Sequence, residues 1–374
     1  MKIAYISVYR DGTGYSNAAI NNILSIEKMG INIVCRPISL SSTINQDQCV
    51  VKDLEDKDLN NITHIIQHVL PHMFEYKSGV KNIGYLDWET DNILRSNWAN
   101  CCNLMDAIFV PCEANKQALI NSGVKSKIFI IPHACNHERF KVKQDKINLG
   151  VHKNKCIFYN IGELNKRKNL PGLIRAYYSA FSSRDDVVLV VKTNMPGKTP
   201  EEVQNEIKTM CADIRKYVHI YPQDSKYPPI LMISNRLNNQ ELDKLHATGD
   251  IFVSLSKGEG WNIPAHDAMC WGNIPILSST GGHITITQSN NDYLVSGTET
   301  PCFGVVDGFN DLYTGKEFWF EADLKDAINK MKSFYKHWHN NILFSNIREN
   351  VRKIGLTFDY NYVGGLIKRA IEEI

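Results

Sequence analysis

Two carboxylates with a fixed spacing give this sequence its clearest chemical signal. Glu259 lies between Gly258 and Gly260, and Asp267 follows after seven intervening residues. Carboxylates accept hydrogen bonds from hydroxyl groups, whereas the free N–H groups at a helix N-terminus favour anions such as phosphate. The combination predicts a pocket for a nucleotide sugar. The spacing alone also fits a strand-to-helix turn with one capping carboxylate.

The surrounding residues predict the elements that would hold these carboxylates. Ile251–Ser256 is an apolar, β-rich run, which predicts a strand that ends before the glycine turn. Asn262 fits the N-cap of a helix, with Pro264 in its first turn and Gly272 after its end. Ile274–Ser279 is the next expected strand. The first carboxylate is therefore expected in the loop before a helix, and the second in the early turns of that helix.

The stretch 254–282 resembles the donor-site signature of retaining GT-B glycosyltransferases of the family-4 type. In that family a glutamate, seven residues and a second glutamate follow a strand and a Gly-Glu-Gly turn. The resemblance implies that Glu259 is a catalytic residue that binds hydroxyls of the transferred sugar, and that Asp267 binds the ribose diol. Asp267 is one methylene shorter than the glutamate of the family. Further donor-binding residues implied by the resemblance are Gly258, Gly260, Trp261 and Asn262.

A basic turn after another expected strand extends the resemblance. Lys155–Leu164 reads as a strand, and the turn after it reads Asn-Lys-Arg-Lys-Asn. The family has Gly-Arg-Leu, three residues, then Lys and Gly or Asn, and this chain matches at Gly162, Leu164, Lys168 and Asn169. The arginine position is Glu163, so Arg167 is the nearest replacement. The resemblance implies that Lys168 and Arg167 bind the donor diphosphate and that Lys168 is catalytic.

The N-terminus has the opening of a doubly wound sheet. Lys2–Tyr9 predicts a strand, a turn with Gly12 and Gly14 follows, and a helical pattern then leads to a second strand at Ile31–Cys35. The turn lacks the full G-x-G-x-x-G pattern of dinucleotide-binding folds. In the resembled family this loop borders the donor phosphates, which implies donor-binding roles for both glycines.

Two further polar groups follow expected strands of the first half. The strand Ile62–Leu70 leads to His68 and His72, and carboxyl ends of parallel strands face the ligand crevice. Relatives in the resembled family place a histidine near the reacting sugar, so His68 is a candidate catalytic residue and His72 a candidate acceptor ligand. A structural or surface role for either histidine stays open.

Asp87, Trp88 and Glu89 follow the strand Asn82–Leu86. An indole face stacks on a pyranose ring while carboxylates accept its hydroxyls, so this cluster predicts acceptor binding. It also fits the start of a helix with an N-cap.

Strands alternate with helices twice along the chain, which predicts an α/β protein with two Rossmann-like, doubly wound parallel-sheet domains. With the resemblance, this is the GT-B arrangement, in which the domains face a central cleft. We expect an acceptor domain at 1–140, a donor domain at 150–340, and a helical segment at 341–374 that packs back on the first domain. Val218–Tyr221 is one of the short strands expected in the donor domain.

Composition limits the class of protein. The 374 residues are 43% hydrophobic and 22% charged, with a net charge of +2, as in a globular protein without a global polyanion signal. No apolar run approaches the roughly 20 residues that span a bilayer, and the N-terminus reads as a strand, so we expect a cytoplasmic protein, or a host-cytoplasmic one if phage-encoded. The ten cysteines show no C-x-x-C pair, and no Asp-x-Asp motif follows a strand, so neither disulfides nor a metal site are expected.

The resemblance implies a metal-independent hexosyl- or pentosyltransferase (EC 2.4). Its co-substrate would be a UDP- or GDP-sugar, with UDP favoured and no other cofactor, and its favoured acceptor is a glycan. A bacteriophage-type DNA glycosyltransferase is an alternative, because Arg139–Lys155 holds six Lys or Arg residues against one acid. That stretch also fits a solvated linker. A non-catalytic sugar-nucleotide-binding protein is a third reading, motivated by Glu163 and Asp267.

Overall fold

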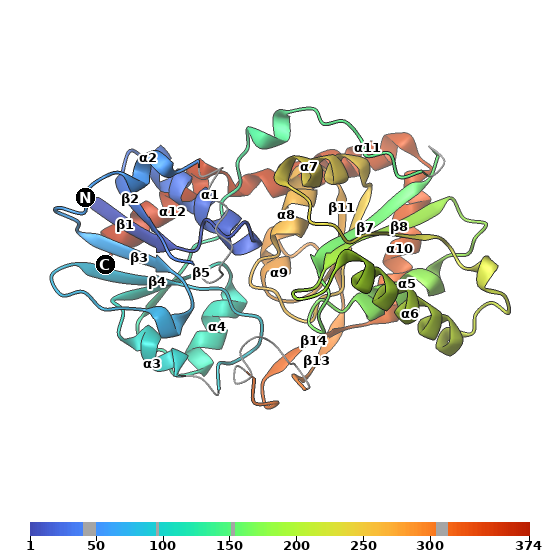
Figure 1. The fold of residues 1–374 in the computed structure, drawn as a ribbon, viewed down its shortest axis with the longest axis horizontal. Helices are drawn as coiled ribbons and strands as arrows, with labels where there is room; N and C mark the ends of the chain where they lie inside the picture. Colours follow the sequence, from blue (N-terminus) through green and yellow to red (C-terminus); the bar gives the residue numbers. More distant parts are fainter. Residues whose placement is uncertain (40–49, 95–96, 151–153, 304–312) are drawn as a thin grey trace.

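A computed structural model describes residues 1–39, 50–94, 97–150, 154–303 and 313–374. It contains two six-stranded sheets in which every neighbouring pair of strands is parallel. Each sheet is flanked by helices, and the two halves lie side by side (Figure 1). Among the described residues, no helix is both long enough and apolar enough to cross a bilayer.

The N-terminal sheet has the strand order β2-β1-β3-β4-β5-β6. Its strands are β1 (Lys2–Ser7), β2 (Asn32–Pro37), β3 (His64–His68), β4 (Lys81–Tyr85), β5 (Ala107–Val110) and β6 (Lys127–Ile130). The helical elements of this half are α1 (Gly14–Lys28), α2 (Lys52–Glu55), η1 (Pro71–Met73), α3 (Trp98–Asn103), α4 (Glu113–Asn121) and η2 (Arg139–Lys141).

The C-terminal sheet has the order β12-β11-β10-β7-β8-β9. Its strands are β7 (Cys156–Glu163), β8 (Val187–Asn194), β9 (Ile230–Ile233), β10 (Ile251–Ser254), β11 (Ile274–Ser278) and β12 (Leu294–Val295). The helical elements are α5 (Leu170–Ala180), α6 (Pro200–Val218), η3 (Asp224–Lys226), α7 (Asn239–Thr248), α8 (Ile263–Cys270), α9 (Gly282–Ile286) and α10 (Leu324–Trp338).

The central strands are buried on both faces, because their residues are mostly apolar. In β8 the seven residues Val187–Thr193 are all buried, and helices cover both sides of such a parallel sheet. In each sheet the strand order reverses next to the first strand, between β1 and β3 and between β7 and β10. Ligands of open α/β sheets bind outside the carboxyl ends of strands at such points. The predicted site residues follow those ends.

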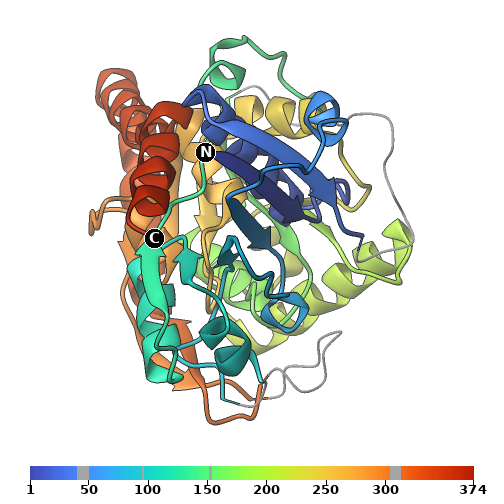
Figure 2. The same ribbon diagram turned by 90° about the vertical axis from the view of Figure 1, so that its left-hand side faces the viewer.

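The C-terminal helices connect the two halves. α11 (Asn341–Gly355) packs against α8 and α10, and η4 (Leu356–Phe358) leads into α12 (Tyr360–Glu372), which packs against α1. Figure 2 shows this last helix, in red, beside the N-terminal strands. A Cβ at Gly364 would overlap the carbonyl oxygen of Ser25, so α12 approaches α1 with backbone almost in contact.

One element interrupts the alternation of strands and helices. β13 (Gly297–Pro301) and β14 (Phe318–Ala322) form an antiparallel hairpin, seen at the bottom of Figure 1 between the halves. By contrast, the predicted strand at Val218–Tyr221 is wrong. Helix α6 continues to Val218 and ends at His219, which has a left-handed backbone with φ of 48°.

Candidate functional site

A buried ion-pair group lies at the carboxyl ends of the C-terminal sheet. Glu259 follows β10, is 5% exposed, and its two carboxylate oxygens lie 2.7 and 2.9 Å from Nζ of Lys168. Arg167 Nη1 donates to the same carboxylate at 3.1 Å and to the carbonyl of Gly258 at 2.7 Å. The basic turn after β7 and the glycine turn after β10 therefore meet. The structure brings together the three residues predicted from two separate motifs.

Arg167 also links the group to the N-terminal half. Its Nη2 lies 3.4 Å from Glu89, in the loop after β4. Glu163, at the arginine position of the resembled pattern, accepts from Asn165 at 3.2 Å within its own turn. Arg167, rather than residue 163, is thus the second cation beside Glu259.

The electrostatics of the group follow from its burial and its pairing. Burial would raise the pKa of Glu259, but the facing Lys168 and Arg167 outweigh burial and lower the pKa to about 2. Burial lowers the pKa of Lys168 in spite of the facing carboxylate. Burial likewise raises the pKa of Glu89, against the pull of Arg167. Glu259 is therefore ionised at neutral pH, in a place where charges are weakly screened.

Both glycines around Glu259 face the N-terminal loop at close range. A Cβ at Gly258 would overlap the carbonyl oxygen of Glu89, and one at Gly260 would lie 2.7 Å from Cβ of Asp87. A side chain at either position would push the halves apart. The structure thus gives these glycines a packing role. The donor-binding role predicted for them stays a prediction.

A second polar group faces the first from the N-terminal sheet. Asp87 Oδ1 lies 2.8 Å from Nε2 of His133, and Asp87 Oδ2 lies 3.8 Å from Nε2 of His68, the last residue of β3. The His68 ring stacks on Tyr85 with centroids 4.3 Å apart, and its Nδ1 shares a hydrogen bond with the hydroxyl of Tyr5 at 2.8 Å.

Burial sets the charge state of this second group. It lowers the pKa of His68 to about 4, so the imidazole is neutral at pH 7. Burial would raise the pKa of Asp87, but the two imidazoles hold it well below its usual range. His68 Nε2 is buried and has no hydrogen-bond partner among the described residues. Its nearest charged neighbour is Oδ2 of Asp87, at 3.8 Å.

Sequence reasoning missed His133 as part of this group. It lies in the loop after β6, and its Nδ1 is 3.1 Å from the Tyr85 hydroxyl and 3.3 Å from Nδ2 of Asn22. No local pattern marks it, because its partners come from β4 and α1.

Among the described residues, two clusters contain metal-ligand residue types. The ligand atoms of His68, Asp87 and His133 lie within 4.8 Å of one another, and so do those of Cys135, His266 and Cys270. His266 has both ring nitrogens engaged, since Trp261 Nε1 donates to Nδ1 at 3.0 Å and Nε2 lies 2.9 Å from the carbonyl of Gly355. A metal at the cysteine cluster would have to displace one of these hydrogen bonds.

The glycine loop after β1 lies against the C-terminal half. Arg236 Nη2 donates to the carbonyls of Asp11 at 3.3 Å and of Gly12 at 3.4 Å. Gly12 has a φ of 63°, and a Cβ there would lie 2.9 Å from the same guanidinium nitrogen. Gly14 is the first residue of α1. Both glycines thus lie at the boundary between the halves.

Three predicted ligands also have structural partners, and the binding roles predicted for them stay predictions. Trp88 is 2% exposed and packs against Trp98 and Tyr313, and it also lines the cavity beside Glu259. Trp261 is also 2% exposed, and its indole N–H is given to a histidine. Asp267 Oδ2 is paired with Arg139 at 2.9 Å.

The remaining predictions have simpler outcomes. Asn262 caps α8 as expected, because its Oδ1 accepts from the N–H of Ala265 at 3.2 Å. His72 lies on η1 and stacks on Trp98, a contact that leaves its predicted acceptor role untested. Arg139, the first cation of the basic stretch, is bound internally to Asp243 and Asp267, and residues 151–153 of that stretch lie outside the described residues.

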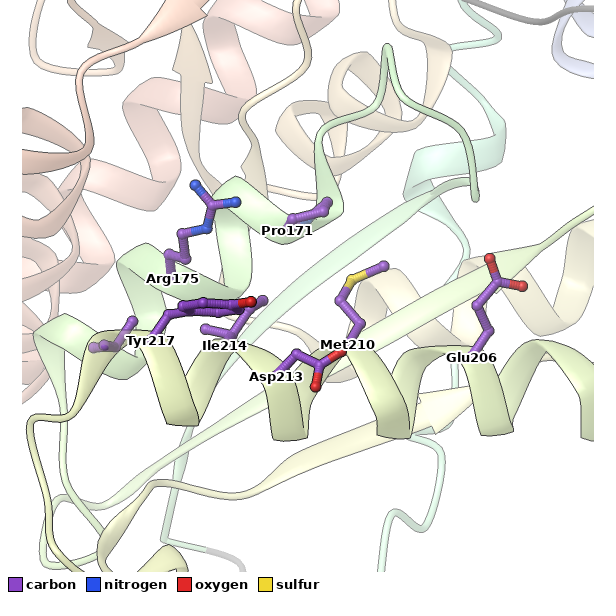
Figure 3. Close-up of a pocket in the computed structure, with 8 residues that line it drawn as sticks. Pro171, Arg175, Glu206, Met210, Asp213, Ile214 and Tyr217 are labelled. Atoms are coloured by element: carbon purple, nitrogen blue, oxygen red, sulfur yellow. The ribbon is translucent and has the colours of Figure 1, made fainter. Parts of the chain in front are cut away.

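Two cavities differ in their relation to these groups. A groove of about 710 Å³ lies on the outside of the C-terminal half, where side chains of α6 such as Tyr217 and Met210 face Pro171 and Arg175 of α5 (Figure 3). A smaller cavity of about 390 Å³ is lined by Glu259, Glu89 and residues of both halves. The chemistry of the ion-pair group belongs to the smaller cavity.

Comparisons with known proteins rest on structure alone. No protein-family model matches the sequence, and no curated protein matches it. The structure of Escherichia coli trehalose-6-phosphate synthase bound with UDP-2-fluoro glucose superposes with a TM-score of 0.66 at 11% identity, over 100% of this chain and 99% of that chain. A glycosyltransferase from Rickettsia africae gives 0.65 at 12% identity, over 100% and 98%.

Staphylococcus aureus TarM, in complex with Fondaparinux, alpha-GlcNAc-glycerol and UDP, gives a TM-score of 0.54 at 12% identity. The match covers 82% of this chain and 54% of TarM, so the chain spans about half the length of TarM. These likenesses agree with the two doubly wound sheets described above. The fold is GT-B. The predicted fold class is thereby confirmed, and in GT-B terms the Glu259 group belongs to the C-terminal domain and the Asp87 group to the N-terminal domain.

Proposed function

We propose that the chain is a retaining glycosyltransferase that moves a sugar from a nucleotide diphosphate sugar to a hydroxyl group of a glycan acceptor. The observation that carries this proposal is the ion-pair group of Glu259, Lys168 and Arg167. It holds an acceptor of hydroxyl hydrogen bonds and two cations, each of which lies within 3.1 Å of the Glu259 carboxylate. A sugar joined to a diphosphate needs both kinds of partner at this short separation.

The charge of the leaving diphosphate gives the cations their role. Negative charge grows on the leaving phosphate in the transition state, and preorganised cations in a buried site stabilise that charge strongly. Lys168 and Arg167 would supply this stabilisation while Glu259 orients the sugar hydroxyls. The leaving phosphate would take the proton of the acceptor hydroxyl, so no residue needs to act as a covalent nucleophile.

The Asp87 group would complete the sugar pocket from the N-terminal domain. Nε2 of buried His68 supports this, because it has no hydrogen-bond partner among the described residues, and a sugar hydroxyl that reached it would satisfy it. UDP is the favoured nucleotide, because solved structures of similar fold contain UDP or UDP-2-fluoro glucose. The proposed reaction needs no metal, since cationic side chains stabilise the phosphate, and unchanged turnover in EDTA is expected.

A thermal-shift screen against UDP- and GDP-sugars tests donor binding. A ligand present at about 100 times its Kd should stabilise the native state by about 2.7 kcal/mol. NMR of the transferred sugar then tests retention, since product and donor should share one anomeric configuration. Failure of every nucleotide sugar to stabilise the protein would refute the proposal, and an inverted product would refute retention.

A further inference from the structure

The cavity beside Glu259 is built from both domains. The N-terminal domain contributes the loop of Glu89 and Asp91 and residues of α4. The C-terminal domain contributes Glu259, the turn Ser279–Gly281 and the β13–β14 hairpin. Because it opens next to the carboxylate proposed to hold the donor sugar, the cavity lies where an acceptor would approach that sugar.

The charges of this cavity are one-sided. Its described lining contains four carboxylates and no lysine, arginine or histidine, the carboxylates being Glu89, Asp91, Glu259 and Glu299. Two of these carboxylates, Glu89 and Glu259, are paired with Arg167. Of the other two, Glu299 is exposed on β13, and Asp91 accepts only neutral donors, the N–H of Phe318 and Nδ2 of Asn92, in its described hydrogen bonds. The described lining therefore has an excess of negative charge at Asp91 and Glu299.

The hairpin adds aromatic surface to the same cavity. Phe318, Trp319 and Phe320 all line it, and Phe318 is 39% exposed. The nearby cation Lys257, 5.2 Å from the Trp319 ring, is paired with Glu321 and does not reverse the negative potential. Aromatic rings cover the C–H faces of saccharides, and carboxylates accept their hydroxyls.

Two hydrogen bonds between Asp91 and Phe318 hold the hairpin against the N-terminal domain. Asp91 N–H donates to the carbonyl of Phe318 at 3.1 Å, and Phe318 N–H donates to Oδ1 of Asp91 at 2.6 Å. The aromatic strand thus has a fixed position relative to the N-terminal domain, as a specificity-determining wall requires.

We infer that this cavity is the acceptor site and that it selects an uncharged or amino-bearing saccharide over a phosphorylated one. The inference rests on the proposed function. A phosphate placed about 10 Å from an unneutralised carboxylate, at an effective dielectric constant near 20, would be disfavoured roughly tenfold. The site would thus reject a sugar phosphate, whatever acceptors other GT-B proteins use.

Three probes that share the same pyranose ring but differ in net charge test the selectivity. They are glucose, glucosamine and glucose 6-phosphate. Binding of each to the full chain saturated with UDP is measured by calorimetry. We expect glucose or glucosamine to bind about tenfold or more tightly than glucose 6-phosphate. Equal or tighter binding of glucose 6-phosphate, or no binding of any probe, would overturn the inference.

A charge reversal then tests whether the cavity is the origin of the selectivity. Glu299→Lys should reduce the preference for glucose over glucose 6-phosphate severalfold, whereas Glu201→Lys, an exposed change on α6 of the same domain, should leave it unchanged. An unchanged preference in Glu299→Lys would place the selectivity elsewhere and overturn the inference. Donor binding is read separately by the thermal shift with UDP-sugars, so loss of that shift counts against the proposed function and not against the acceptor class.

Discussion

At the scale of single residues, Glu259 combines a proposed catalytic role with a structural one. Its carboxylate is the shared partner of Lys168 and Arg167, and all three are largely buried. Glu259→Gln keeps the size of the side chain but leaves two cations without their counter-charge. We expect stability to fall by about 3–5 kcal/mol and kcat to fall at least about a hundredfold, because one partner of a buried pair is removed.

Urea unfolding and donor turnover measure the two effects of Glu259→Gln. The matched control is Glu321→Gln, which removes a half-exposed partner of Lys257 and should cost about 1 kcal/mol or less. Wild-type kcat in a folded Glu259→Gln protein would remove Glu259 from the proposed catalytic group.

Buried histidines predict a loss of stability in mild acid. Burial lowers the pKa of His68 to about 4. Burial also lowers the pKa of His283 to about 4, where Glu259 opposes this shift and Lys168 and Arg167 add to it. Both imidazoles are neutral in the native state, so their contributions to the free energy of unfolding are complete above the ordinary histidine pKa of about 6.5. These contributions are lost as the pH falls towards 4, because the unfolded chain takes up protons at a higher pH than the native protein does. Each contributes up to about 3 kcal/mol to this change.

Urea unfolding between pH 7 and pH 4.5 measures this loss. His283→Gln should flatten the dependence of the unfolding free energy on pH, whereas His72→Gln, an exposed change, should leave its slope as in the wild type. Equal slopes for wild type and His283→Gln would show that His283 is not a source of the acid sensitivity.

Some residues of the two polar groups were predicted from the sequence and others were not. The difference lies in how far apart along the chain the interacting residues are. Lys168 and Glu259 lie in local motifs, each next to the strand that positions it. The Asp87–His133 contact joins residues 46 positions apart, and the Arg139–Asp267 ion pair spans 128 positions. Such contacts depend on how the elements assemble. The motif around Asp267 therefore did not reveal the ion pair that Asp267 forms with Arg139 in the folded chain.

At the scale of elements, the glycine turn after β10 fixes the distance between the domains. Gly258→Ala should lower the unfolding free energy by about 1–3 kcal/mol and reduce turnover, because its methyl group would overlap the carbonyl of Glu89. Gly365→Ala is the control, since a Cβ there comes no closer than 3.6 Å to a flexible arginine side chain. Thermal unfolding and donor turnover measure both variants. Wild-type behaviour of Gly258→Ala would mean that the two loops separate freely.

Elements bounded by caps and glycines were predicted well, whereas the short run Val218–Tyr221 was not. The sequence places β10 and α8 correctly, because glycines and the Asn262 cap bound them. Val218–Tyr221 was predicted as a strand, but a capping box at Thr199 starts α6, which extends to Val218. A run of four residues does not distinguish the end of a helix from a strand. The β13–β14 hairpin escaped prediction because it departs from the helix–strand alternation around it.

At the scale of the whole molecule, α12 joins the two domains outside the cleft. It packs on α1, and Tyr360 Oη donates to Oδ1 of Asn21 at 2.7 Å, while α11 before it packs on α8. The domains are thus linked both through the glycine turn and through the C-terminal helices. If the cleft geometry depends on this second link, loosening α12 should impair transfer without impairing donor binding, because the Glu259 group lies in the C-terminal domain.

Two adjacent glycines of α12 allow a matched test. Gly364 faces the backbone of Ser25, whereas Gly365 faces a flexible arginine side chain at 3.6 Å. Replacing glycine by valine changes the intrinsic helix propensity equally at both positions. The two variants therefore differ in the contact with α1, and only Gly364→Val should separate α12 from α1. We expect it to split thermal unfolding into two transitions and to lower transfer about tenfold or more, since small displacements of reacting groups are costly. Affinity for UDP, measured by calorimetry, should stay within about twofold in both variants, because a donor site within one domain does not need the link. Equal effects of the two valines on transfer would show that α12 stabilises the fold without setting the geometry of the cleft.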